Sequence, residues 1–142
     1  MALANTFLDA SLPGNALVPA SSVFDTLCAP NVQVTGPVGG EVFSGGSSQS
    51  ITWQMSDEQA NPFLTTWVNL SVNSGGSFPT PIEGATAHVE GSVSIPWTAN
   101  RVDTTTARVQ VCVQDETGLV TCDASPSDFA IDSTLLVVFG AV

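Results

Sequence analysis

The sequence holds few residues that could carry out catalysis. Its one histidine, His88, is the only candidate base for a Ser-His-Asp or Cys-His arrangement, and no motif sets a nucleophile and an acid beside it. The Gly-Ser stretches 45–47 and 73–77 are not nucleophile elbows, because no strand-to-helix turn follows them. A pair of glycosidase carboxylates would need a cleft, which domains of this size rarely offer. We therefore expect that the protein is not an enzyme.

Carboxylates are the second set of groups that could do chemistry. Three expected loops, at 57–63, 83–90 and 115–118, gather at one pole of the predicted fold, and each carries acids. Clustered carboxylates suit Ca²⁺, which prefers about six to eight oxygen ligands. The candidate metal ligands are Asp57, Glu58, Asp115 and Glu116. However, no D-x-D-G loop is present, and an acid-rich chain places acids in its loops by composition alone. Calcium is the one cofactor that the sequence suggests, and we expect no other.

Two of the three cysteines are placed to form a disulfide. Cys112 and Cys122 stand symmetrically about Thr117, so a hairpin that turns there sets them nearly opposite each other. This pairing requires an oxidising compartment, and the alternative is three unpaired thiols in a reducing cytosol. Cys28 is the odd cysteine if the pair forms. The chain has no C-x-x-C, so the sequence does not favour zinc.

The charge balance argues against several classes of partner. Thirteen acids face two arginines and no lysine, which gives a net charge of −11. Nucleic acid binding needs a basic patch, and an anionic membrane surface repels such a chain. No apolar stretch reaches the ~20 residues of a membrane span, and the first residues lack the basic and apolar regions of a secretory leader. We interpret the excess of acids first as a means of keeping the protein soluble. The alternative interpretation is that the acids bind a cation or a basic partner.

The candidate residues must be positioned by the secondary structure around them. Short runs in which apolar and polar residues alternate recur along the chain, and their spacing predicts an all-β fold. Apolar residues alternate with polar ones in runs at 32–34, 51–55, 68–72, 93–97, 109–113, 119–122 and 129–131. Such spacing, without helical periodicity, is typical of a sandwich of two packed antiparallel sheets. In the stretch GGEVFSGGSSQSITW, two glycine pairs predict turns on either side of a short edge segment, 42–43, that crosses between the sheets. Trp53 then enters the core.

Five pieces of the chain resemble the Ig-like or fibronectin-III-like modules of secreted bacterial and fungal surface proteins. They are GGEVFSGGSSQSITW, VNLSVNSGGSFPTPI, GSVSIPW, TTTARVQVCVQD and SPSDFAI. The set is similar to the family that includes the N-terminal domain of Kre9/Knh1-type cell-wall proteins. The resemblance covers residues 31–132 and implies a β-sandwich accessory module without a shared catalytic site, so it assigns no functional residues. The segments 1–30 and 133–142 depart from the family's pattern.

Trp67 and the chain ends are the predicted contacts with a partner. By alternation, Trp67 points away from the core, where it could stack on a sugar, anchor a protein or lie under the chain's own N-terminal segment. Residues 1–30 are expected to form an extended arm. Residues 133–142 are uncharged, and we expect this apolar strand to be covered by addition to a sheet edge, in its own sandwich or a neighbour's. The residues expected to contact a partner are Trp67, Leu135, Leu136, Val138 and Phe139.

Together these features favour a non-enzymatic Ig-like β-sandwich whose extended ends lock it into an oligomeric surface assembly. The setting that we expect is a virion surface, with the chain as a capsid-decoration protein. The alternative is a secreted cell-surface module for adhesion or glycan binding, and a third interpretation is an accessory domain of a hydrolase. The expected partners are subunits of its own kind, other proteins or a glycan, and the expected location is a virion surface or the outside of a cell.

Overall fold

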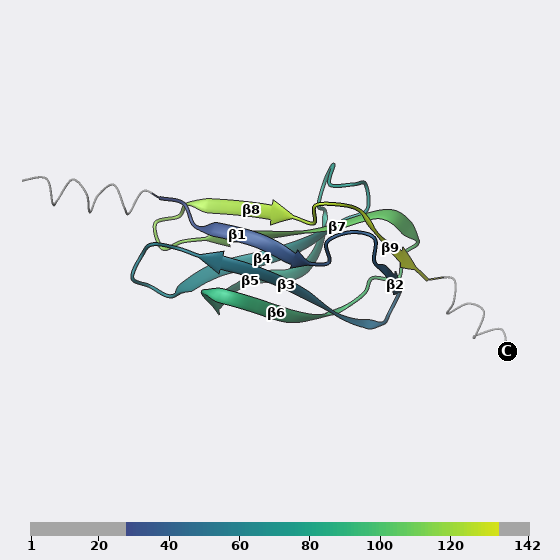
Figure 1. Ribbon diagram of the computed structural model, residues 1–142, viewed down its shortest axis with the longest axis horizontal. Helices are drawn as coiled ribbons and strands as arrows, with labels where there is room; N and C mark the ends of the chain where they lie inside the picture. The colour runs from purple at the N-terminus through teal and green to yellow at the C-terminus, as the bar shows by residue number, and fades with distance from the viewer. Residues whose placement is uncertain (1–27, 134–142) are drawn as a thin grey trace, which may run out of the picture. The chain divides into compact units, whose positions relative to one another are not determined.

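A computed structural model describes residues 28–133 of the chain, which hold nine β-strands and no helix (Figure 1). The strands are β1 (Asn31–Gly36), β2 (Val42–Ser44), β3 (Ser48–Ser56), β4 (Phe63–Ser71), β5 (Thr80–Val89), β6 (Gly91–Thr98), β7 (Thr104–Gln114), β8 (Val120–Ala124) and β9 (Phe129–Asp132). Contacts divide the chain into two units, residues 1–28 with 58–60 and residues 29–57 with 61–142, and all nine strands belong to the second unit. The described part has no helix that could cross a membrane.

The first sheet consists of β1, β3 and β6, with β3 in the middle and antiparallel to both neighbours. The alternation that predicted β3 is confirmed, because Ile51, Trp53 and Met55 are buried while the residues between them are not. The register sets Val34 of β1 and Val93 of β6 on either side of Trp53. This sheet therefore turns one apolar face inwards.

The second sheet has the order β2–β9–β7–β4–β5, and β8 is a further partner of β7. β7 divides one of its sides between two strands: its first half pairs with β9 around Thr104 and Ala107, and its second half pairs with β8 from Gln110 to Gln114. β2 runs parallel to β9, whereas the other pairs in this sheet are antiparallel. Residues 125–128 separate β8 from β9, and both of these short strands pair with β7.

The inner faces of the two sheets form one hydrophobic core. Trp53 of the first sheet and Val109 and Val111 of the second are completely buried, at 0% exposure. Phe43 and Phe129 pack edge-on to each other, with ring centroids 5.5 Å apart. A large apolar side chain buried in this way contributes about 1.5–3 kcal/mol relative to an exposed one. The predicted all-β sandwich of two sheets is confirmed.

The glycine-rich stretch before β3 carries the chain from one sheet to the other. β1 belongs to the first sheet, whereas β2 pairs with β9 in the second. Gly39 and Gly40 lie between these strands with φ angles of +133° and +84°, which other residues rarely adopt. A Cβ atom at Gly39 would also collide with Ser127. Glycine is therefore required at this crossing, as the sequence predicted.

One prediction about the strands is wrong. We expected a loop at 83–90, whereas the structure has strand β5 up to Val89. β5 lies at a sheet edge and residues 84–87 are exposed, so its sequence shows no apolar alternation. The predicted N-terminal arm and C-terminal apolar strand, including Leu135, Leu136, Val138 and Phe139, lie outside the described residues except at 28–30 and 133.

Candidate functional site on the sandwich surface

The outer face of the second sheet carries the tryptophan that the sequence singled out. Even-numbered residues from 64 to 70 of β4 are buried, so the odd-numbered ones face outwards. Trp67 is half-buried on this outer side. It is in register with Cys112 of β7, which is in register with Cys122 of β8. Side chains in register across antiparallel strands lie ~4.5–5.5 Å apart at Cβ, so Trp67 borders Cys112, and Cys112 borders Cys122.

Exposed apolar side chains extend this surface towards one end of the sheet. Phe63 of β4 and Val89 of β5 are in register, and they are 52% and 54% exposed. Val120 of β8, opposite Gln114, is 45% exposed. We call this surface the apolar face; its members are Phe63, Trp67, Ala87, Val89, Cys112, Val120 and Cys122. Thr65 and Gln114, which are in register with Ala87 and Val120, stand among these residues. An exposed apolar surface on a soluble domain often marks a site of interaction.

No charged side chain stands within the apolar face, although the whole chain has a net charge of −11. β4 contains no charged residue, and Glu83 of β5 is bound to His88 Nε2 at 3.0 Å. Asp123 of β8 accepts a hydrogen bond from the Val34 N–H at 2.8 Å, which turns it towards β1. Arg108 of β7 lies opposite Ser71, the last residue of β4, and Gln114 lies opposite Thr65. Glu83 and Asp123 therefore lie on strands at the edge of the described sheet and not within the apolar face.

The structure joins Cys112 and Cys122 by a disulfide with an S–S distance of 2.06 Å. The bond spans ten residues and closes the hairpin formed by β7 and β8. Cys112 is only 4% exposed although it points away from the core. Cys28 lies outside this disulfide and is half-buried.

The outer face of the first sheet has a different chemistry. Its outward residues are almost all Ser, Thr, Asn or Gln, and we call it the hydroxyl–amide face. Thr35 donates a hydrogen bond from its Oγ1 to Thr52 Oγ1 at 2.9 Å across two of its strands. Pro96 is the exception among its exposed members. The face consists of Asn31, Gln33, Thr35, Ser48, Ser50, Thr52, Gln54, Ser56, Ser92, Ser94, Pro96 and Thr98.

Among the candidate metal ligands, Asp115 has the best defined surroundings. Its Oδ1 accepts hydrogen bonds from the Thr117 N–H at 2.8 Å, the Thr117 hydroxyl at 2.6 Å and the Leu119 N–H at 3.0 Å. Burial raises the pKa of this carboxyl, but the hydrogen bonds from Thr117, Leu119 and Gly118 outweigh it and hold the pKa below its ordinary value. The side chain thus organises the β7–β8 turn.

The described residues give the calcium hypothesis no geometric support. In the range 28–133, no three or more His, Cys, Asp or Glu side chains are grouped so that they could hold a metal ion. The Asp57 N–H donates to Glu90 Oε1 at 3.0 Å, so the Glu90 carboxylate serves the backbone after β3. Glu116 is exposed, and Glu58 belongs to the first unit of the chain.

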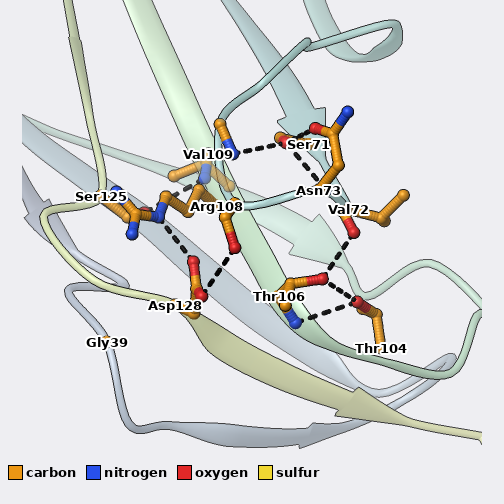
Figure 2. Close-up of polar contacts among 12 residues, drawn as sticks. Gly39, Ser71, Val72, Asn73, Thr104, Thr106, Arg108, Val109, Ser125 and Asp128 are labelled. Atoms are coloured by element: carbon orange, nitrogen blue, oxygen red, sulfur yellow. Dashed lines mark hydrogen bonds and ion pairs between the residues drawn. The ribbon is translucent and has the colours of Figure 1, made fainter.

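A network of polar contacts lies near the start of β7, at the other end of this strand from the turn that holds Asp115 (Figure 2). Asp128 accepts a hydrogen bond from Arg108 Nε at 2.6 Å and another from the Ser74 hydroxyl at 2.8 Å. The Arg108 guanidinium therefore holds the pKa of the Asp128 carboxyl below its ordinary value. Thr106 accepts the Ser74 N–H at its carbonyl and donates from its hydroxyl to Val72 O. This network ties the β4–β5 loop to β7 and to the segment before β9, and we assign it a structural role.

Comparison with solved structures identifies the fold. A chain described as CbhA fibronectin(III)-like modules of Clostridium thermocellum is similar to this protein, with a TM-score of 0.53 and 18% sequence identity. The match covers 76% of this chain and 49% of that one, so this chain spans about half the length of its structural relative. No protein-family model and no curated protein matches the sequence. At this identity the likeness shows the fold alone, which is fibronectin-III-like. The resemblance to the Kre9/Knh1-type family stays a prediction.

Sequence reasoning found part of this surface and missed the rest. It identified Trp67 as an outward residue because the alternation in its strand is regular. It missed Val89, because β5 was taken for a loop, and Phe63, which begins its strand beyond the recognised run. The hydroxyl–amide face was also missed, although every second residue from 48 to 56 is Ser, Thr or Gln. That polar alternation was a usable signal.

Proposed function

We propose that this protein is a non-enzymatic structural module of an oligomeric surface assembly, with a virion surface, where it decorates a capsid, as the setting. The fibronectin-III-like fold is consistent with a structural or adhesion module. The disulfide between Cys112 and Cys122 suits an oxidising environment, which the outside of a cell or a virion provides. Catalysis forms no part of this proposal.

The distribution of charge carries the proposal. Two copies with a net charge of −11 repel each other, so they associate only where charge is absent and apolar area is buried. Physiological salt screens exposed charges beyond ~8 Å, which leaves short-range burial to decide the contact. The apolar face meets this requirement, since Phe63 and Val89 are both more than half exposed and no charged side chain stands between them. This combination favours a subunit contact.

Trp67 supports a second candidate function, a secreted cell-surface module for adhesion or glycan binding. Its indole is half-buried on an outer sheet face, where an aromatic ring can stack on a sugar or anchor a protein. Phe63 faces the same side of β4, four residues before it. A glycan array separates this candidate from the first, because binding that is lost in Trp67→Ala supports glycan recognition.

Sedimentation velocity over a range of concentrations tests the proposed function. We expect the full chain to form species larger than its 14.6 kDa monomer at physiological salt. Phe63→Glu places a charge in the apolar face and should weaken association at least tenfold, because the carboxylate would lose its hydration in the contact. Ser50→Glu makes the matched change on the hydroxyl–amide face and should have little effect. A monomer at every concentration contradicts the proposal.

A further inference from the structure

The edges of the two sheets differ in how they are protected from pairing with another strand. On β1, the Val34 N–H is already bonded to Asp123 Oδ2 at 2.8 Å. On β6, Pro96 removes a backbone donor from the middle of the strand. β2 and β8 are short, with three and five residues. Short strands, prolines and edge charges are the devices that block strand addition, and the far end of β5 has none of them.

The exposed end of β5 offers regular backbone groups for pairing. β5 is bulged opposite residues 66–69 of β4, but from Thr86 to Val89 its register is regular. The Glu90 N–H donates to Pro62 O at 2.8 Å, so residue 90 points its backbone groups at β4. These groups alternate along an antiparallel strand. Ala87 and Val89 therefore direct their N–H and C=O groups to the free edge.

The acids that frame this edge are turned inwards. Glu83 is bound to His88 at 3.0 Å, and Glu90 accepts the Asp57 N–H at 3.0 Å. Residues 84–87 carry no charge and are exposed. Ala87 and Val89 also belong to the apolar face, beside Phe63. A strand added to β5 would thus pair with an uncharged edge and would lie next to the apolar face.

The sequence contains a segment that fits this edge. Residues 134–139, TLLVVF, have no charge, no proline and no glycine, and they are rich in side chains that favour β-strands. Such a segment exposed to water is prone to pair with other strands. We infer that the β5 edge of one copy receives residues 135–139 of a second copy as an added strand, an inference that rests on the proposed oligomeric function.

The copy that supplies the strand must be a different one, because the segment cannot reach its own β5. Ser133 is held at the start of β7 by Asp103 Oδ1, 2.8 Å from its N–H, and by Val102 O. Ala87 lies level with Gln114, at the opposite end of β7, through the register of Thr65. The separation is about 33 Å along the strands and about 14 Å across them. Residue 139 reaches at most about 20 Å from Ser133.

The positions of the two surfaces decide the type of assembly. The chain leaves β9 at one end of the sandwich, and the turn from β5 to β6 lies at the other end (Figure 1). The donor segment follows the end of the molecule where β9 stops, and the acceptor edge is a different surface, so their contact is heterologous. A heterologous contact that repeats head to tail produces a ring or a filament.

Two single variants of the full chain and their mixture test this inference. Ala87→Pro removes an outward N–H from the β5 edge without touching the pairing to β4, and Ala87→Lys adds a charge there. Val137→Lys places a charge in the otherwise uncharged donor segment. In sedimentation velocity, each variant alone should be monomeric where the native chain is assembled, because each keeps only one half of the contact. An equimolar mixture of Ala87→Pro and Val137→Lys should recover a capped dimer of about twice the 14.6 kDa monomer mass.

The matched control is Ser94→Pro, which removes an outward N–H from the β6 edge, two residues before Pro96, and should leave assembly unchanged. Circular dichroism must show that each variant is folded. If both Ala87 variants still assemble, the inference about β5 is wrong and the proposed oligomeric function stands. If the mixture recovers nothing, the head-to-tail pairing is wrong. A native chain that never assembles overturns the proposed function as well.

Discussion

Thr52 and Trp67 hold equivalent positions on the two outer faces of the sandwich, each on a strand that has a partner on both sides. Thr52 hydrogen-bonds Thr35 on the hydroxyl–amide face, whereas Trp67 borders a disulfide on the apolar face. Both strands alternate in the same way towards the core. The core pattern therefore determines the fold, and the outward residues are free to differ in chemistry. That freedom is where we locate function.

The largest effect should come from the disulfide of the apolar face. Replacing both Cys112 and Cys122 by alanine should lower the free energy of unfolding by about 2–3 kcal/mol, since the loop closed by the bond spans ten residues. Urea denaturation measures the loss, and a reductant should have the same effect on the native chain. The paired control, Gln54→Ala with Ser94→Ala on the hydroxyl–amide face, should change it by no more than about 0.5 kcal/mol. Equal losses would mean that the two faces contribute alike to stability.

A smaller difference is expected for the two central residues themselves. Trp67→Ala should cost about 1–2 kcal/mol, because half of a large aromatic surface is removed from contact. Thr52→Ala should cost about 0.5 kcal/mol, because it removes one exposed hydrogen bond. Urea midpoints of the two variants give the comparison directly. If Trp67→Ala costs no more than Thr52→Ala, the indole does not pack against the sheet.

The smallest effect concerns pH and should come from the poles, because neither outer face holds a carboxylate. The pKa of Asp115 is lowered in the folded state, so its contribution is present above the unfolded pKa of about 3.9 and is lost as pH falls through the folded pKa. Asp115→Asn should therefore cost about 1 kcal/mol at pH 7 and less at pH 3. Urea midpoints at both pH values measure this. A cost that does not change with pH would show that the hydrogen bonds to Asp115 do not depend on its charge.

The sequence predicted the fold better than the surfaces, for a physical reason. β7 is buried in the middle of a sheet, so Val109, Val111 and Val113 must alternate with polar residues, and the strand is obvious. β5 has a neighbour on one side only and is mostly exposed. Residues such as Gly84 and Thr86 can therefore occupy it without loss of core packing. β5 escaped detection because little of its surface is constrained by the core.

The candidate surface follows the same rule. Trp67 could be found because the alternation of its strand is regular and places this apolar residue on the outer side. The spacing of Cys112 and Cys122 suggested their pairing before the structure joined them. The neighbours of Trp67 depend on register, which pairs Phe63 with Val89 across strands that are 26 residues apart in number. Registers with bulges, such as that of β4 with β5, cannot be read from one strand alone.

The position of the disulfide has a mechanical consequence for a chain pulled from its C-terminal side. Tension applied beyond Ser133 would first peel β9 away from β7 and β2, since those pairings are short. Next it would load β8, where the bond from Cys122 to Cys112 passes the force directly into the central strand. While the disulfide is intact, the residues between Cys112 and Cys122 cannot be extended. Under such tension the β7–β8 hairpin therefore stays closed after β9 has been detached.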